Sequence, residues 1–205
     1  MLLPIVLFTP ELPENAALVV SGRTEVWARF TGHLRTAKLS QIYSLEQRQV
    51  HRRTGRQFIF ADALELDKAP GTDLHLAHLE REVKKLFAGF AALEHGTTVI
   101  APPWGCGAFG GDLQVKLLVL WLAASLSGRV KELRVILVPY FRDLLGPSFN
   151  MTAKKYATMT PAAIWKLLSA CKEPEDIWGM QGYPGGSPSV PHIGVGCQVS
   201  MPPPP

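Results

Sequence analysis

The nine residues 104–112 (WGCGAFGGD) contain four glycines and separate two apolar runs. The run before them, residues 97–101, is short and β-branched like a strand, whereas the run after them, residues 112–126, has the length and composition of a helix. Residues 133–138 (LRVILV) form the next strand-like run. This order makes a βαβ unit, so we expect an α/β fold with a mixed or largely parallel sheet and helices on its faces.

The glycine-rich loop has the chemistry of an anion site. Its glycines let the backbone approach a ligand closely and adopt positive φ where a turn requires it. Because the loop leads into a helix N-terminus, its amide groups and the helix dipole favour a phosphate or diphosphate. The alternative is a tight turn whose glycines serve only packing, with Asp112 as the helix cap.

Residues 105–110 also fit the pattern G-x-G-x-x-G of dinucleotide-binding folds. Two features speak against that interpretation. Residues 102–104 (PPW) separate the strand from the glycines, and no acidic residue ends the next strand, since Val138 leads into residues 139–141 (PYF).

The remaining chain up to residue 171 reads as further strands and helices. Residues 16–20 and 57–61 are short apolar runs typical of strands. Residues 73–93 carry apolar side chains at helical spacing, and we expect Glu80, Arg81, Lys84 and Lys85 on the polar face. Thr160 followed by Pro161 predicts the start of a helix that ends near Cys171.

Composition divides the chain into one domain, residues 1–171, and a disordered tail, residues 172–205, rich in Pro, Gly and Ser. The net charge of +4 suits an anionic partner but is too small for a dedicated nucleic-acid site. We expect no membrane segment, because the apolar opening is short and no basic residue precedes it. The three cysteines, Cys106, Cys171 and Cys197, lack disulfide or zinc spacing and favour an intracellular compartment, nuclear or cytoplasmic.

The segment WGCGAFGGD resembles the diphosphate loop of the poly(ADP-ribose) glycohydrolases, and residues 7–12 (LFTPEL) and 61–64 (ADAL) are similar to other family segments. The resemblance covers residues 5–171 and implies a macrodomain-like three-layer α/β/α sandwich with a mixed sheet. It implies an ADP-ribose or poly(ADP-ribose) ligand, or poly(ADP-ribosyl)ated protein partners, and no cofactor or metal. It places the diphosphate on Gly105, Cys106, Gly107, Ala108, Phe109 and Gly110, and the adenine and adjoining ribose near Phe141 and His33.

Two departures from the family pattern bear on activity. The family carries Gln-Glu-Glu shortly before the segment resembling LFTPEL, and its second glutamate protonates the leaving ribose oxygen. Read without gaps, Leu2 and Leu3 occupy those places here, and leucine offers no acid for glycoside cleavage. We therefore expect an N-terminally truncated domain with no catalytic residue. His33 also stands where the family has a tyrosine.

Three hypotheses follow. The first is an ADP-ribose-binding member of the family that does not hydrolyse the polymer alone. The second is an active glycohydrolase whose missing elements come from upstream sequence. The third is an interaction module with an unoccupied pocket and the proline-rich tail as partner site. Outside the loop, we expect a solvated basic stretch at residues 48–56, no metal at His75 and His78, and plain surface charges at Asp62, Glu65 and Asp67.

Overall fold

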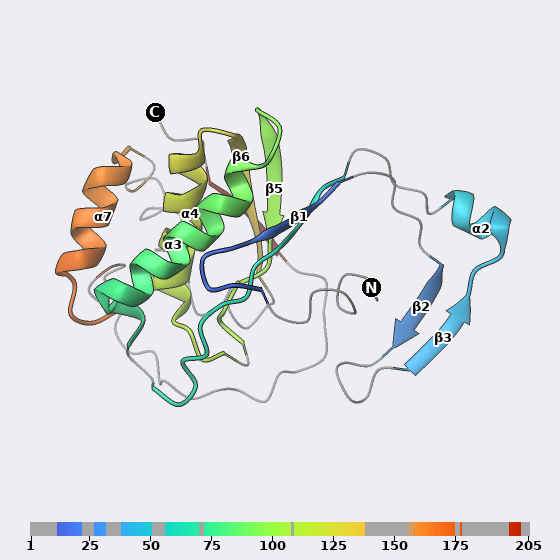
Figure 1. Cartoon of the computed structure of the whole chain (residues 1–205), viewed down its shortest axis with the longest axis horizontal. Helices are drawn as coiled ribbons and strands as arrows, with labels where there is room; N and C mark the ends of the chain where they lie inside the picture. The colour runs from blue at the N-terminus through green and yellow to red at the C-terminus, as the bar shows by residue number, and fades with distance from the viewer. Residues whose placement is uncertain are drawn as a thin grey trace. The chain divides into compact units, whose positions relative to one another are not determined.

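The computed structural model describes residues 12–21, 27–31, 38–50, 56–69, 72–107, 109–137, 156, 158–174, 177 and 197–201. The chain divides into two compact units. One comprises residues 1–12 and 18–60, and the other residues 13–17 and 61–205. Figure 1 shows the helices and strands of each unit.

The larger unit is built on the βαβ arrangement that the sequence predicts. Strand β5 (Thr97–Ala101) is followed by helix α4 (Leu113–Ser127) and strand β6 (Val130–Leu137), and the two strands pair in parallel. A third strand, β7 (Cys197–Met201), pairs antiparallel with β6, so the sheet order is β5-β6-β7. The described sheet is therefore mixed, as expected.

Helix α4 forms the centre of the core. Its first twelve residues, 113–124, are all buried, because α4 packs against α3, α7 and β6. The Asp112 carboxylate caps the helix by accepting from the amides of Gln114 and Val115. Gly128 ends it with a φ of 61° in the left-handed region. The expected capping role of Asp112 is confirmed.

Helix α3 (Leu76–Ala91) lies beside α4 (Figure 1). Its predicted apolar stripe is buried at Leu79, Val83, Leu86 and Phe90. The predicted polar face is wrong at one position, because Lys85 is fully buried at 0% exposure. Its ammonium pairs with Asp62, and this ion pair compensates the burial of a long cationic side chain.

Helix α7 (Pro161–Ala170) begins where the sequence predicts. The Thr160 hydroxyl accepts from the amide of Ala163, and proline occupies the first helical position. Ile164 and Leu168 are the side chains that α7 buries. Helix α4 therefore packs against β6 and is also covered by α3 and α7.

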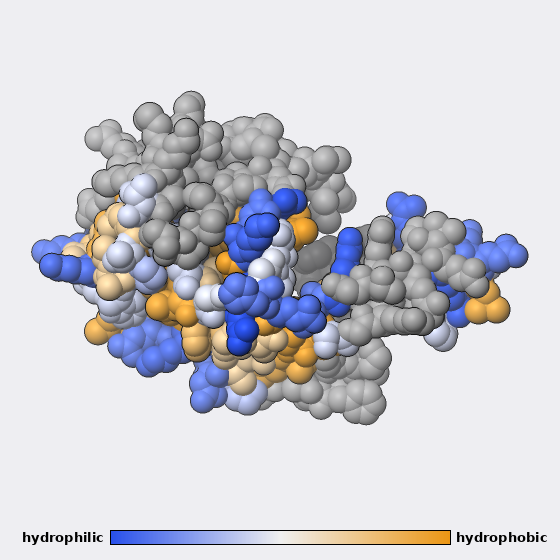
Figure 2. All heavy atoms as spheres, turned by 90° about the horizontal axis from the view of Figure 1, so that it is seen from above, coloured by the Kyte–Doolittle hydropathy of each residue, from blue (hydrophilic) through white to orange (hydrophobic). Residues whose placement is uncertain are grey.

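The smaller unit contains short antiparallel pairs. Strand β1 (Leu18–Val20) pairs with β4 (Phe58–Phe60), and β2 (Ala28–Thr31) pairs with β3 (Lys38–Ile42) before the short helix α2 (Leu45–Val50). The β2–β3 pair and its flanks leave large apolar side chains exposed among charged ones (Figure 2). These side chains are Trp27, Phe30, Leu39, Ile42 and Leu45.

Within the predicted disordered tail, residues 172–205, Cys197–Met201 form strand β7. Cysteine, valine and methionine alternate with glutamine and serine there, which is the period of a strand. The open edge of β6 supplies the hydrogen-bonding partner, with Val199 opposite Val135. Composition alone hides this strand, because the residues around it are rich in proline and glycine.

Candidate functional site

The loop between β5 and α4 is braced by its own backbone. Four of its amides donate to carbonyl groups at the start or within the loop, at distances of 2.7 to 3.1 Å. The donor and acceptor pairs are Trp104 with Pro102, Cys106 with Pro103, Gly110 with Gly107, and Gly111 with Gly105. These bonds fix the loop's shape without a ligand.

Three glycines are required by the close packing of the loop. Gly105 and Gly110 have φ of 79° and 68°, which L-residues rarely adopt. A Cβ at Gly110 would lie 2.7 Å from the Cα of Asp67. A Cβ at Gly111 would lie 2.7 Å from the carbonyl oxygen of Gly105 and would overlap the side chain of Lys116. The packing interpretation of these glycines is therefore correct.

Gly107 differs from the other three. It is exposed, its φ is not positive, and a Cβ there would meet nothing within 4 Å. The amides of Gly105, Gly107 and Phe109 donate to no acceptor in the described part of the chain. Unpaired amides in a loop that leads into a helix N-terminus are the groups that bind an anion. Gly107 is therefore the glycine of the loop that packing does not require.

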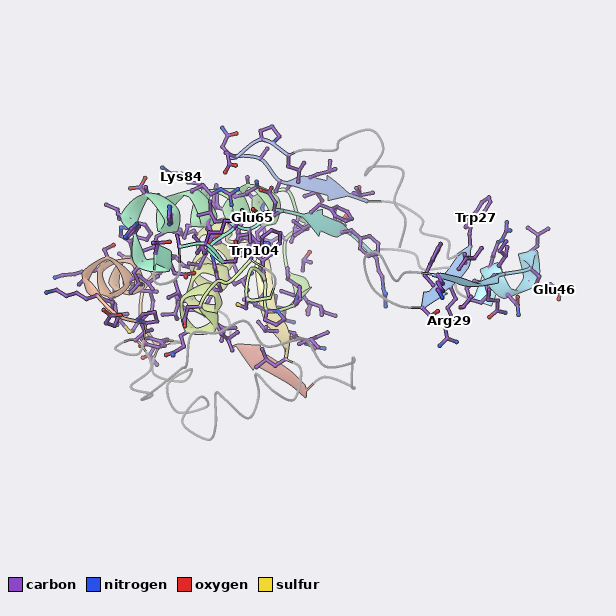
Figure 3. All side chains as sticks on the ribbon, turned by 90° about the horizontal axis from the view of Figure 1, so that it is seen from below. Trp27, Arg29, Glu46, Glu65, Lys84 and Trp104 are labelled. Carbon is purple, nitrogen blue, oxygen red and sulfur yellow. The ribbon has the colours of Figure 1, made fainter. Side chains whose placement is uncertain are left out.

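The loop is tied to the segment that follows β4. The Trp104 indole donates to the carbonyl of Ala61 at 2.8 Å, and the amide of Leu66 donates to the carbonyl of Phe109 at 2.7 Å. Figure 3 shows Trp104 close to the segment that carries Glu65. The two ends of the loop are therefore held by the same short segment, residues 61–66.

Three charged side chains are buried behind the loop. Lys116, Glu82 and Asp73 are 1%, 2% and 3% exposed. The Lys116 ammonium forms an ion pair with Glu82 and lies 3.4 Å from Oδ1 of Asp73. It also lies 5.6 Å from the ring centroid of Trp104, within reach of a cation–π interaction. These contacts join α3, α4 and the loop.

Burial sets the protonation of two groups at the site. It raises the pKa of Asp73 above its usual value, although the charge of Lys116 acts in the opposite direction. It also raises the pKa of the Cys106 thiol well above its usual value. Because a thiol that keeps its proton is a poor nucleophile, Cys106 is no candidate for covalent catalysis.

The sequence analysis did not identify Lys116, Glu82 or Asp73 as part of the site. A signal was present, since Lys116 is the one charged residue within the apolar run of α4. Of the predicted diphosphate set, Gly105, Cys106, Gly107, Phe109 and Gly110 lie together in the loop, and Ala108 lies outside the described residues. Phe141, His33, Leu2 and Leu3 also lie outside them.

The other candidates have plain structural settings. Asp62 is exposed but pairs with Arg81 and with Lys85. Burial acts to raise the pKa of Asp62, yet the hydrogen bonds from Lys85 and Arg81 outweigh it and lower that pKa. The Nδ1 of His78 lies 2.9 Å from the carbonyl oxygen of Thr72, and no group of three metal-binding side chains occurs in the described ranges. No helix within those ranges has the length and apolar character needed to cross a membrane.

Comparison with known proteins identifies a family model and a relative that this chain resembles. The family model described as "Poly (ADP-ribose) glycohydrolase (PARG), Macro domain fold" matches residues 1–137. A stretch of 26 residues is 62% identical to the "Probable poly(ADP-ribose) glycohydrolase 2" of Arabidopsis thaliana. That stretch is 13% of this chain and 5% of the relative, so the match spans a small part of the relative's length.

Proposed function

Because the chain belongs to the poly(ADP-ribose) glycohydrolase family, which has the macrodomain fold, we propose that it binds ADP-ribose, free or within poly(ADP-ribose), through the loop 104–112. The observation that carries the proposal is the exposed edge of the loop at Gly107. There the amides of Gly105, Gly107 and Phe109 have no acceptor among the described residues. A diphosphate supplies oxygen acceptors and negative charge at a helix N-terminus.

Binding without hydrolysis is the activity that we propose for this chain alone. Described residues of the loop provide amides but no carboxylate at its exposed edge, and Cys106 is buried with a neutral thiol. Leu2 and Leu3, at the places of the family's glutamates, offer no proton to a leaving ribose oxygen. An intracellular setting, nuclear or cytoplasmic, and poly(ADP-ribosyl)ated protein partners belong to the same proposal.

The test is calorimetric titration with ADP-ribose of the wild-type chain and of Gly107→Glu. The glutamate meets open space, so the variant should fold, yet its carboxylate repels a diphosphate at the loop amides. We expect at least about a tenfold loss of affinity, equivalent to about 1.4 kcal/mol. Gly107→Gln, which has the same size without the charge, separates steric from electrostatic obstruction.

Two other outcomes select the remaining hypotheses. If the folded wild-type chain binds no ADP-ribose, the proposal fails and the interaction-module hypothesis remains to be tested with the tail removed. Release of ADP-ribose from purified poly(ADP-ribose), monitored by chromatography with the same samples, would contradict the proposed lack of hydrolysis. Hydrolysis that disappears in Gly107→Glu would assign the activity to this loop.

A further inference from the structure

The buried charges behind the loop are costly and call for a physical explanation. Moving an ion from water into a protein interior costs several kcal/mol, and apolar side chains of similar size often replace a buried ion pair without loss of stability. Lys116 and Glu82 are nevertheless almost fully buried, at 1% and 2% exposure. Side chains that lower stability at their position, as buried charges do, are typical of functional sites.

Glu82 connects the ion pair to one side of the loop. Its Oε1 accepts from the amide of Leu64 at 3.0 Å, while its Oε2 accepts from the Lys116 ammonium. Two residues beyond Leu64, the amide of Leu66 holds the carbonyl of Phe109. One carboxylate thus fixes both the lysine and the short segment that holds the loop.

Lys116 supports the base of the loop from behind. Side chains on a helix lean toward its N-terminus, so the lysine at the start of α4 extends back beneath the glycines. A Cβ at Gly105 would lie 3.2 Å from Cε of Lys116, and one at Gly111 would overlap that atom. Gly105 and Gly111 are the two residues whose backbone bond, at 2.9 Å, closes the loop.

We propose that Lys116 and Glu82 are positioning residues for the diphosphate: the pair holds the base of the loop so that its unpaired amides face the ligand. This inference rests on the proposed function of the loop. The cluster of Lys116, Glu82 and Asp73 holds two carboxyl groups and one ammonium, so it supplies no excess of positive charge. Its contribution to binding comes through the geometry of the amides.

The decisive comparison uses Lys116→Met and the double variant Lys116→Met/Glu82→Gln. The single variant leaves Glu82 as an uncompensated buried charge and is expected to lose stability. In the double variant, glutamine can still accept from the Leu64 amide, and no unpaired charge is left on residue 82. The remaining carboxyl, Asp73, has a pKa that burial already raises, so it takes up a proton more readily than an ordinary carboxyl. We expect the double variant to regain thermal stability and yet to bind ADP-ribose at least about tenfold more weakly than the wild type.

Leu168→Ala is the control for a general loss of stability. Leu168 is fully buried on α7, which packs on α4. This variant should lose stability while its ADP-ribose affinity stays within about twofold of the wild type. A stable double variant that binds like the wild type would overturn the positioning role and leave the proposed function intact.

Amide hydrogen exchange tests the inference even if ADP-ribose does not bind. The Gly111 amide, which donates to the Gly105 carbonyl, should exchange at least about tenfold faster in Lys116→Met/Glu82→Gln, whereas amides in the middle of α4 should not change. Unchanged exchange at Gly111 would contradict the positioning role. Faster exchange in a wild-type chain that binds no ADP-ribose would keep that role and reject only the proposed ligand.

Discussion

The interior behind the glycine loop and the β2–β3 hairpin differ in which side chains they bury and which they expose. Behind the loop, Lys116 and Glu82 are charged and buried. On the hairpin, Ile42 and Leu39 are apolar and exposed at 66% and 51%. In the first region, burying charge lowers stability but fixes the geometry, because a buried ion pair needs its two side chains in one specific arrangement. The second leaves apolar surface in water, so its described side chains build no core.

Local interactions hold the hairpin instead. The Arg48 guanidinium lies 4.1 Å from the ring centroid of Trp27, and its Nε donates to the carbonyl of Tyr43 at 3.0 Å. The Ser40 hydroxyl donates to the carbonyl of Arg29. A two-stranded hairpin is marginally stable without further packing. Substitutions should therefore have large effects behind the loop and small effects on the hairpin.

Glu82→Ala should have the largest effect. It removes the partner of Lys116 and the acceptor of the Leu64 amide together, and breaking a buried ion pair costs about 3–5 kcal/mol. Urea denaturation should show this loss in the free energy of unfolding. The exposed pair on the same helix, Lys84 with Glu80, provides the control, since Lys84 points away from the core (Figure 3). Glu80→Ala should cost less than about 0.5 kcal/mol; equal losses would contradict the comparison.

Asp73→Asn should have a smaller, pH-dependent effect. Burial raises the pKa of Asp73 above its ordinary value of 3.8. The folded state therefore binds the proton more tightly than the unfolded state. Ionisation of Asp73 therefore lowers the free energy of unfolding as pH rises above 3.8, and the loss reaches its full size once pH exceeds the raised pKa. Asparagine cannot ionise, so the variant should lack this part of the pH dependence.

The measurement for Asp73 is the free energy of unfolding of the wild type and of Asp73→Asn at two pH values. The first, about pH 4.5, lies close to the ordinary pKa of a carboxyl group, and the second, about pH 7.5, lies well above it. Between these conditions the wild type should lose more stability, or gain less, than Asp73→Asn. Carboxylates with a lowered pKa, such as Asp62, act in the opposite direction but are common to both proteins. An identical pH dependence in the two proteins would show that Asp73 titrates as an exposed carboxyl does.

Sequence predicts the parts of the fold that short-range signals determine. Thr160 with Pro161, and Asp112 at the start of α4, are caps that need only their neighbours in the chain. Strand β5 and helix α4 follow from apolar runs separated by glycines. The strand β7 was missed, because its pairing partner β6 lies some 60 residues earlier, at Val130–Leu137, and its surroundings read as a tail.

The loop glycines of the candidate site could be identified from the sequence, but the buried charged side chains behind the loop could not. Gly105 and Gly110 are conspicuous because their spacing in the chain is unusual. The role of Lys116 depends on Glu82, which lies 34 residues away, and burial of both is decided only when α3 packs on α4. A helical pattern also places Lys85 on the polar face, because periodicity carries no information about a partner such as Asp62. Buried charges are therefore where pattern reasoning fails.

Ile42→Thr should have the smallest effect of these substitutions. Threonine keeps the β-branched shape that suits a strand, and the isoleucine side chain is mostly in water, so little apolar burial is lost. The change in the free energy of unfolding should stay within about 0.5 kcal/mol. Urea denaturation of Ile42→Thr and Glu82→Ala in one series measures the smallest and the largest expected change in the free energy of unfolding. A loss above about 1 kcal/mol would mean that Ile42 is covered in the folded protein, because exposed positions rarely reach that value.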